Sequence, residues 1–439
     1  MNEPTAHRVL VCTDLPFWRG ASGAQQRILS LVEFLRKRHA VRIFCLAGST
    51  EVSELDAETI AAKNLDVEFR SSDQIPASFW KRVGWYFAAT KNQWFPKSGS
   101  TTQRSASTTL ADYRWPWAID ALHESIESFR PNVLLIEYVK LAYLIEGLSK
   151  QIREQLFCVL DTHDVLHLRN EQFRSREVAH WINIDREAES AAVGLFDLAI
   201  AIQSEEAELF RDMAPQTNVI TCGHFTPTPI AKASDTPSRT ADESLTTVSE
   251  NSNPVLRFGF IGSDNHANML SLQTFLETTW RFAVEQLAPK SIELRIAGRV
   301  CDQLNLECLG STVGDTIEIV GYVDSLDQFY DSVDVIVNPV QFGTGLKIKN
   351  IEALAYAKPL ISTPHSLTGM QLDSAGEYAD VGLPARIFET PESFVELVAL
   401  LLDPITLKTM AAAAKRYRQT VLSEQSVYSE LDQVLSNLK

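Results

Sequence analysis

The sequence predicts an α/β protein with two doubly wound domains, each built on a parallel sheet. The chain has 439 residues, too many for one ordinary core and enough for two domains of about 200 residues. Short apolar runs typical of buried strands alternate with segments of helical periodicity. The alternation stops once and then restarts. Strands that alternate with helices indicate βαβ units, which place the strands in parallel.

The first domain is expected to span residues 1–225. It opens with a buried strand at Arg8–Cys12, a small-residue loop and a helix over Ala24–Arg38. Apolar residues in that segment recur at the spacing of one helix face. A strand follows at Val41–Leu46, and later apolar runs predict further strands at 133–136, 157–160, 198–202 and 219–222.

Residues 226–254 are rich in Pro, Ser and Thr and are predicted to be a linker or exposed insertion. The second domain is expected over 255–405, and the helices of 406–439 are expected to pack back on the first domain. Two doubly wound domains form a cleft, and ligands bind beyond the carboxyl ends of the strands. The strands of the second domain are predicted at 256–261, 292–297, 317–320, 333–337 and 360–362.

Composition narrows the class of protein. Hydrophobic residues make up 45% and charged residues 22% of the chain, as in soluble globular proteins. The formal net charge of −16 disfavours nucleic acid as a partner. No apolar run approaches the ~20 residues that span a bilayer, and the N-terminus does not resemble a secretory signal. Six cysteines without a C-x-x-C pair suggest reduced thiols in a cytoplasmic protein.

The strongest motif follows the strand that begins at Asp334. The strand leads into Gln341–Gly345 and then into a helix that carries Lys347 and Lys349. Glycines let the backbone approach a ligand closely, and a helix N-terminus offers free N–H groups and a positive dipole end. The motif therefore predicts a diphosphate site. The alternative is an ordinary helix start with a surface pair of Lys349 and Glu352.

Residues from Phe258 to about Met370 resemble the donor domain of group 1 (GT4-type) retaining glycosyltransferases, in a glycine- and lysine-rich subtype. The resemblance rests on FGFIGSDNHANMLSL, on LRIAGR, and on VGYVDSLDQFYDSVDVIVNPVQFGTGLKIKNIEALAYAKPLISTPHSLTGM. It implies a GT-B fold, with two Rossmann-like doubly wound parallel-sheet domains that face each other across a cleft. It also implies a nucleoside-diphosphate sugar as donor substrate.

The resemblance implies a role for each residue of the donor site. Glycines and their neighbours would wrap the diphosphate and sugar, lysines and an arginine would supply positive charge, and other residues would hold the ribose, base and phosphate. The diphosphate and sugar would be wrapped by Gly343, Thr344, Gly345 and Leu346. Positive charge would come from Lys347, Lys349 and Arg299. The ribose would be held by Glu352, the base by Tyr322 and Val323, and the phosphate by Ser263. Lys347 is the catalytic candidate among them.

Two departures from the family pattern stand out. Thr344 occupies a position where many members have a sugar-binding glutamate, eight residues before Glu352. The stretch Ser263–Asn268 lacks the Arg and Lys that many members place there to neutralise phosphate. The lysines of the loop would then carry more of the phosphate charge, and the donor sugar stays open.

Two loops of the first domain complete the predicted site. Gly20–Gly23 resembles the family's glycine loop that faces the donor phosphates, with Gly23 as the contact; the alternative is a plain turn in which Ser22 caps a helix. The loop lacks G-x-G-x-x-G, which disfavours a nicotinamide site. In the family, a histidine at the end of the strand at 157–160 contacts the transferred sugar, and His163 is our candidate.

The loop that carries His163 allows other interpretations. Asp161 and Asp164 would serve as caps and packing residues, and His167 would belong to a helix surface or core. Together with His163 these are also metal-ligand types. Transferases of this class do not generally need a metal, so we expect none, and no permanently bound cofactor.

A basic and aromatic segment distinguishes the first domain. From Gln74 to Ala111 there is no acidic residue. Such composition suits an interfacial helix on anionic lipid, or a pocket for a lipid-diphosphate or polyanionic acceptor; the alternative is a core helix with a loop. The residues proposed for the acceptor or membrane side are Trp80, Lys81, Arg82, Trp85, Lys91 and Trp94.

The resemblance implies a hexosyltransferase that acts with retention on a hydroxyl of a glycan, lipid-linked saccharide or glycolipid. Polysaccharide or lipopolysaccharide assembly in the cytoplasm, at the inner face of the membrane, is the expected setting. Two alternatives remain: an inactive glycosyltransferase-like scaffold or partner protein, and an epimerase or hydrolase of nucleotide sugars on the same fold.

Overall fold

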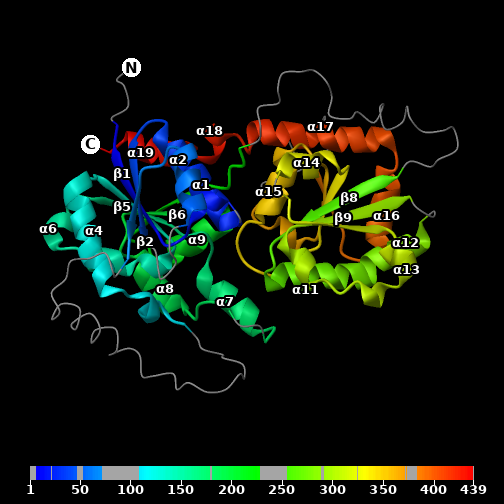
Figure 1. Ribbon diagram of the computed structural model, residues 1–439, viewed down its shortest axis with the longest axis horizontal. Coiled ribbons are helices and arrows are strands. Elements are labelled where there is room, and N and C mark those ends of the chain that lie inside the picture. Colours follow the sequence, from blue (N-terminus) through cyan, green and yellow to red (C-terminus); the bar gives the residue numbers. More distant parts are fainter. Residues whose placement is uncertain are drawn as a thin grey trace. The chain divides into compact units, whose positions relative to one another are not determined.

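The computed structural model describes residues 6–20, 22–46, 53–71, 108–177, 180–227, 255–287, 291–323, 325–370, 372 and 383–438 (Figure 1). Internal contacts divide the chain into two compact units. The first contains Met1–Gly223 together with Val427–Lys439, and the second contains His224–Ser426. The linker predicted at 226–254 lies outside the described residues except for 226 and 227.

The first unit is built on a seven-stranded sheet of order β3-β2-β1-β4-β5-β6-β7. Every neighbouring pair is parallel. The order reverses between β1 and β4, which makes this the switch point where doubly wound sheets bind ligands. The strands are β1 Arg8–Thr13, β2 Ala40–Leu46, β3 Val67–Arg70, β4 Val133–Glu137, β5 Phe157–Asp161, β6 Leu198–Ala201 and β7 Asn218–Thr221.

Helices cover this sheet, so its central strands are continuously apolar and buried, as in other parallel sheets. Three of these helices begin at a side-chain cap or at a proline: Ser22 caps α1, Asp185 caps α8, and Pro116 opens α4. The helices are α1 Gly23–Arg36, α2 Glu54–Ala62, α4 Pro116–Phe129, α5 Tyr143–Glu146, α6 Lys150–Arg153, α7 Leu166–Arg174, α8 Arg186–Val193 and α9 Ser204–Met213, with 3-10 turns at Phe17–Arg19, Leu110–Tyr113 and Val139–Leu141.

The end of the chain belongs to the first unit. Helix α19, Ser429–Ser436, lies against α1 and β1: Tyr428 stacks on Phe34 with ring centroids 4.5 Å apart. The His7 imidazole Nε2 lies 2.8 Å from the carbonyl oxygen of Leu435. The C-terminal helices predicted at 406–439 are therefore divided between the units, since α17, Pro404–Thr420, belongs to the second.

The second unit contains a six-stranded parallel sheet of order β10-β9-β8-β11-β12-β13, with its switch point between β8 and β11. Its core is aromatic: Phe258 from the sheet packs on Trp280 and Phe394 from the helices. The strands are β8 Leu256–Ile261, β9 Ile292–Ala297, β10 Ile317–Gly321, β11 Val335–Asn338, β12 Leu360–Ser362 and β13 Ala385–Ile387.

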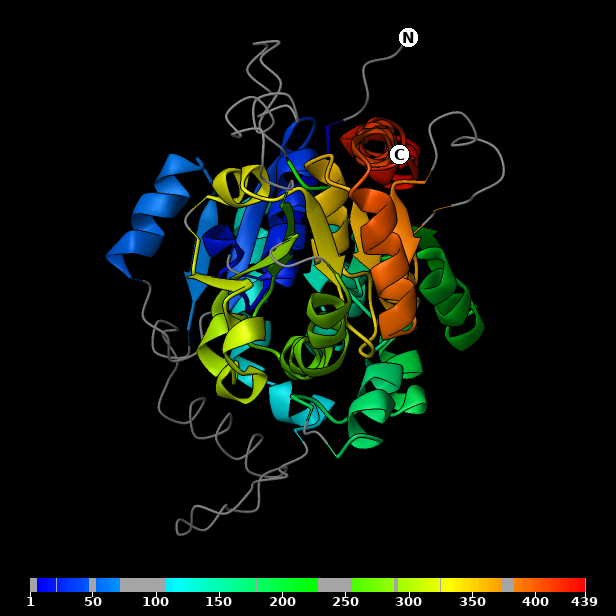
Figure 2. The same cartoon turned by 90° about the vertical axis from the view of Figure 1, so that its right-hand side faces the viewer.

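Helices pack on this sheet too. In Figure 2, α16 runs beside the strands and α17 is seen end-on. The helices are α11 His266–Phe275, which continues through the π-helical turn Leu276–Trp280 into α12 Arg281–Gln286, then α13 Ser311–Gly314, α14 Leu326–Asp331, α15 Ile348–Ala355, α16 Pro391–Leu401 and α17, with α18 Glu424–Val427 at the unit boundary and 3-10 turns at Arg299–Gln303, Glu307–Leu309 and His365–Leu367.

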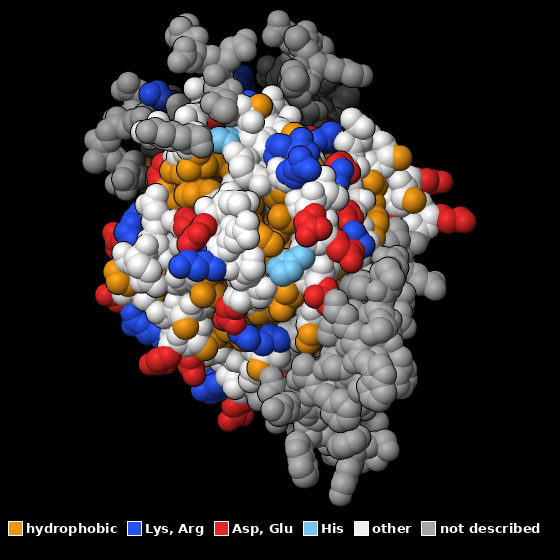
Figure 3. Space-filling model, turned by 90° about the vertical axis from the view of Figure 1, so that its left-hand side faces the viewer, with side chains coloured by type: hydrophobic (Ala, Val, Ile, Leu, Met, Phe, Trp, Pro, Cys, Tyr) orange, Lys and Arg blue, Asp and Glu red, His pale blue; other side chains and the backbone are white. Residues whose placement is uncertain are grey.

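The two parallel α/β sheets confirm the predicted fold class. Cys12, Cys45, Cys158 and Cys222 are buried free thiols, whereas Cys308 is exposed and Cys301 is partly buried. On the face of the first unit in Figure 3, acidic and basic side chains are interspersed. In the described part of the chain no single helix has the length and apolar character to cross a bilayer; α16 and α17 meet that measure only together, with a bend of 97° between them.

Gly298 follows β9 in a conformation that only glycine adopts easily, with φ of +89°, and a Cβ there would lie 2.3 Å from the carbonyl oxygen of Gly262. We predict that Gly298→Ala lowers the free energy of unfolding by about 2–4 kcal/mol, because both the left-handed backbone and the clash oppose a methyl group. Urea unfolding followed by fluorescence measures the change.

Gly314→Ala is the matched control. Gly314 ends the short helix α13, and a Cβ there would meet no atom within 4 Å. This control should change the unfolding free energy by less than about 1 kcal/mol. Equal losses in both variants would contradict the prediction.

Candidate functional site

The loop between β11 and α15 is shaped around the amine of Lys347. Its Nζ donates to the carbonyl oxygens of Gly343 at 2.8 Å, Thr344 at 3.2 Å and Gly345 at 2.8 Å. Gly343 and Gly345 have φ of 96° and 76°, which side chains with a Cβ rarely adopt. The glycines thus allow three successive carbonyls to converge on one ammonium group at the start of α15.

The second lysine, Lys349, ties this helix to the loop after β8. Its Nζ donates to Asn268 Oδ1 at 2.5 Å and lies 4.3 Å from the ring centroid of Phe260. Asn268 in turn donates from Nδ2 to the carbonyl oxygen of Ser263 at 2.9 Å. Burial lowers the pKa of Lys349 to about 7, and the charge of Lys347 adds to the shift while Glu352 opposes it.

Other buried polar groups fix α15 in place. Asn350 is fully buried, accepts from Asn338 Nδ2 at 2.6 Å and donates to the carbonyl oxygen of Ser366 at 2.7 Å. Glu352 is buried as well, and Tyr330 Oη donates to its carboxylate at 3.4 Å. These bonds leave the first turn of α15 in a defined position relative to β11.

The remaining predicted donor residues lie at the same edge of the sheet, where parallel strands end. Arg299 follows β9 and Tyr322 follows β10; Tyr322 is 71% exposed. Arg299 lies 4.0 Å from Asp264 in an exposed pair. Val323 is partly buried and Leu346 is buried. The Thr344 hydroxyl is buried and has no hydrogen-bond partner among the described residues.

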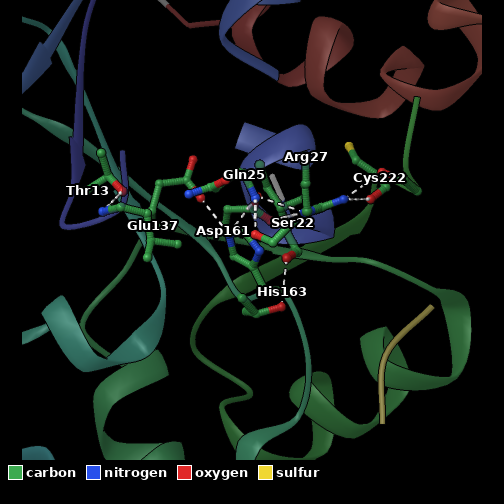
Figure 4. Close-up of polar contacts among 12 residues, drawn as sticks. Thr13, Ser22, Gln25, Arg27, Glu137, Asp161, His163 and Cys222 are labelled. Carbon is green, nitrogen blue, oxygen red and sulfur yellow. Dashed lines mark hydrogen bonds and ion pairs between the residues drawn. The ribbon is translucent and has the colours of Figure 1, made fainter. Parts of the chain in front are cut away.

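In the first unit, charged side chains meet at the carboxyl ends of β4 and β5 (Figure 4). Arg27, from α1, donates to Asp161 with Nε–Oδ2 of 2.9 Å and Nη2–Oδ1 of 2.6 Å. Its Nη1 donates to the carbonyl oxygens of Cys222 at 3.1 Å and Gly223 at 2.6 Å. Both Arg27 and Asp161 are almost fully buried, so the pair depends on these bonds for compensation of lost hydration.

Beside this pair, the imidazole of His163 lies 2.7 Å from the carboxylate of Glu137, measured from Nε2 to Oε2. Burial and the negative charge of Asp161 raise the pKa of Glu137 to about 7, against the opposing effect of His163. The sequence placed His163 here but missed Glu137 and Arg27. Two features of the sequence could have revealed them: Glu137 ends the apolar run VLLIE, and Arg27 lies within an apolar helix face.

The other residues of the histidine loop have partners of their own. Asp164 pairs with Arg169 at 2.5 Å, and His167 is buried in α7 against Glu189, with Nδ1–Oε2 of 2.7 Å. Glu189 also accepts the backbone N–H groups of Leu166 and His167, so it caps α7. These contacts agree with the packing interpretation of Asp164 and the core interpretation of His167.

The guanidinium of Arg27 already lies against the cluster of Glu137, Asp161 and His163. Ligand atoms of Glu137, Asp161 and His163 lie within 4.8 Å of one another, close enough to surround an ion. Both oxygens of Asp161, however, accept from the guanidinium of Arg27. A divalent ion there would have to displace or repel a buried positive charge, so the donor set fits the guanidinium better than a metal.

Gly23 is the first residue of α1, and the Ser22 hydroxyl accepts from Gln25 N at 3.4 Å. This is the helix-cap alternative foreseen for the loop, and it still places backbone N–H groups of α1 at the switch point.

A cavity of about 490 Å³ beside α7 is lined by residues that include Thr109 and Asn170. Trp80, Lys81, Arg82, Trp85, Lys91 and Trp94 lie outside the described residues.

The second unit is similar in sequence to known proteins. Residues 256–403 match the family model of the glycosyl transferases group 1. A UDP-N-acetylglucosamine–N-acetylmuramyl-(pentapeptide) pyrophosphoryl-undecaprenol N-acetylglucosamine transferase from Chromohalobacter salexigens is 34% identical over 106 residues. That match spans 23% of this chain and 28% of the relative.

Solved structures with a similar fold match nearly the whole chain. HepE from Anabaena, in complex with UDP and glucose, has a TM-score of 0.63 at 13% identity and covers 99% of this chain and 100% of its own. Sucrose-phosphate synthase from Thermosynechococcus elongatus has a TM-score of 0.62 at 14% identity, with 98% of each chain covered. The fold is therefore the GT-B fold, and residues 256–403 of its second unit are similar to the glycosyl transferases group 1.

The lowered pKa of Lys349 predicts a pH dependence of stability. Between about pH 7 and pH 10 the unfolded chain holds a proton on this amine that the folded chain has lost, so stability rises with pH in that window. Relative to Lys349→Met, wild-type protein should gain about 3 kcal/mol of unfolding free energy between about pH 7 and 9.5. Urea unfolding at both pH values tests this, and a constant difference would contradict it.

The buried ion pair of the first unit predicts a large effect of mutation. Arg27→Met leaves Asp161 charged, buried and unpaired, and should cost about 3–5 kcal/mol of unfolding free energy. The matched control is Arg186→Met, because Arg186 forms an exposed pair with Asp212 and its loss should cost no more than about 0.5 kcal/mol. Similar costs in the two variants would show that the Arg27 network is dispensable.

Proposed function

We propose that the protein is a glycosyltransferase that moves a hexose-type sugar from a nucleoside-diphosphate sugar to an acceptor hydroxyl, with retention of anomeric configuration. The observation that carries the proposal is the loop of residues 341–347, folded around Lys347 at the start of α15. This loop lies within the part of the chain that matches the group 1 family. Nucleotide-bound structures of the similar fold support the donor class.

The donor diphosphate is assigned to the N-terminus of α15. Free N–H groups of its first turn and the charge of Lys347 stabilise the negative charge that develops on the leaving diphosphate. Lys349 contributes conditionally: its amine has a pKa of about 7 while it is buried against Phe260. A phosphate nearby favours the charged amine, so donor binding would be accompanied by proton uptake near neutral pH.

The other donor contacts follow from the same edge of the sheet. Glu352 is assigned to the ribose, Tyr322 and Val323 to the base, and Ser263 and Arg299 to the phosphates. The unpartnered hydroxyl of Thr344 is assigned to a sugar hydroxyl. It offers one neutral hydrogen-bonding group where a glutamate would offer two charged oxygens.

We assign the acceptor to the first unit, with His163 contacting the transferred sugar. A donor phosphate oxygen takes the acceptor proton, so no covalent protein nucleophile and no metal is required. The acceptor is a glycan, lipid-linked saccharide or glycolipid, and the basic aromatic segment containing Trp80 and Lys81 would bind at the inner face of the cytoplasmic membrane. The undecaprenol-linked substrate in the name of the Chromohalobacter relative supports a lipid-linked acceptor.

Donor binding provides the test. In calorimetry with a panel of UDP-sugars, Lys347→Ala, Lys349→Ala and Glu352→Ala should each weaken binding at least about tenfold, since each removes a charged or hydrogen-bonding group from the site. Lys415→Ala, an exposed lysine on α17, is the control and should bind like wild type. Unchanged affinity in all three site variants would refute the assignment.

Product analysis separates the reaction classes. With a hydroxyl acceptor, wild-type protein should form a glycosylated product. Turnover of donor without any acceptor would indicate a hydrolase or epimerase, and the absence of binding to any sugar nucleotide would indicate a scaffold protein.

A further inference from the structure

His163 is held by a carboxylate at one ring nitrogen and by an aromatic ring on one face. Its Nε2 lies 2.7 Å from Glu137 Oε2. Its ring stacks on Tyr138 with centroids 3.9 Å apart and planes 7° from parallel, and Trp181 packs edge-on against Tyr138 at 6.1 Å. Among the described residues, no hydrogen bond engages the other ring nitrogen, Nδ1. The imidazole is therefore fixed in orientation with one nitrogen available to a ligand.

The backbone is strained where these rings meet. Tyr138 follows β4 with φ of 69°, and His163 follows β5 with φ of 64°. Residues with a Cβ rarely adopt this conformation, and it persists where the surrounding structure enforces it, often at functional sites. Two such residues stacked on each other indicate that the orientation of the imidazole is selected and does not result from relaxed packing.

Glu137 is the carboxylate that can set the proton of His163. Asp161 Oδ2 is 3.6 Å from Nε2, too far for a hydrogen bond, and its oxygens already accept from Arg27. Glu137 is completely buried, and its Oε1 has no hydrogen-bond partner in the described residues. The one side chain with which Glu137 forms a close polar contact there is His163.

We propose that Glu137 is a positioning residue for His163: it accepts the Nε2 proton and so leaves the Nδ1 lone pair to accept a hydrogen bond from a sugar hydroxyl. A carboxylate bound to one nitrogen of an imidazole determines the tautomer of the ring. The hydroxyl as ligand rests on the proposed function, whereas the tautomer does not.

The charge balance of the cluster supports this arrangement. Arg27 neutralises Asp161, and burial next to Asp161 raises the pKa of Glu137 to about 7. When the pair of Glu137 and His163 gains one proton, Nδ1 carries a hydrogen and donates instead of accepting. The groups that contribute to the field at Glu137 are Asp161, His163 and Arg27.

Nitrogen-15 NMR of histidine-labelled protein tests the tautomer without any substrate. The His163 signals are assigned by their loss in His163→Asn. Well above neutral pH we expect the form with hydrogen on Nε2 and none on Nδ1; hydrogen on Nδ1 would overturn the proposal. Zn²⁺ or Mn²⁺ should leave these signals in place, and displacement by stoichiometric metal would mean a cation site instead.

Kinetics test the consequence. Glu137→Gln keeps the shape of the side chain but removes its charge. It should lower kcat about 10- to 100-fold, with KM for the sugar nucleotide changed less than about threefold. It should also abolish the change in kcat that protonation of the Glu137–His163 pair causes near pH 7. Glu137→Asp, which keeps the carboxylate, should recover part of the rate. Wild-type kcat and pH profile in Glu137→Gln would overturn the proposal.

Glu189→Gln is the matched control, because Glu189 forms a buried pair of the same kind with His167 but caps a helix. It should lower stability and leave kcat unchanged; an equal loss of kcat in both variants would show a structural effect and overturn the role of Glu137. If wild-type protein transfers no sugar, the proposed function fails, while the NMR result still decides whether Glu137 sets the tautomer.

Discussion

The carboxyl edge of the first sheet depends on one buried guanidinium. Arg27 reaches from α1 to Asp161 at the end of β5 and to two backbone carbonyls after β7. These contacts satisfy a group that is always charged. They also neutralise Asp161, so the neighbouring carboxyl of Glu137 is left for His163. Without this cation, two adjacent buried carboxylates would repel each other and the histidine would have two competing acceptors.

The second unit uses a different kind of cation. A lysine amine can lose its proton when buried, whereas an arginine cannot. Lys347 donates to three carbonyl oxygens, while Lys349 is buried against Phe260 with its pKa lowered to about 7. A permanent charge thus organises the first unit, and an adjustable one lies where the donor phosphate is proposed to bind.

Local patterns in the sequence were sufficient for most of the fold. The strands predicted at 256–261 and 292–297 coincide with β8 and β9, because their apolar residues are buried at alternate or successive positions, as the strand period requires. The three-residue strand β13, Ala385–Ile387, was not predicted, since its two exposed residues leave no apolar run. The helix predicted to carry Lys347 begins one residue later, at Ile348, because the Lys347 side chain bonds to the loop before the helix begins.

The site was predictable only where its residues are contiguous. The glycines and lysines of the loop form a sequence motif, and His163 was reached through a family resemblance. The contact of Lys349 with Asn268 joins residues 81 positions apart, and that of Glu137 with His163 joins residues 26 apart. No periodicity in the sequence specifies such contacts, because they arise from the order of strands in the sheet. The interpretation of Lys349 and Glu352 as a surface pair was wrong for this reason: Glu352 is buried, and Lys349 is bonded to Asn268.

The return of the last residues to the first unit has a practical consequence for dissecting the protein. The first unit is discontinuous in sequence, since Val427–Lys439 belongs to it. A fragment that stops at Gly223 would lack the ring of Tyr428 that covers Phe34 and the Leu435 carbonyl that contacts His7. A separable first half would have to carry residues 427–439 grafted after Gly223, whereas the second unit, His224–Ser426, is one uninterrupted stretch of sequence.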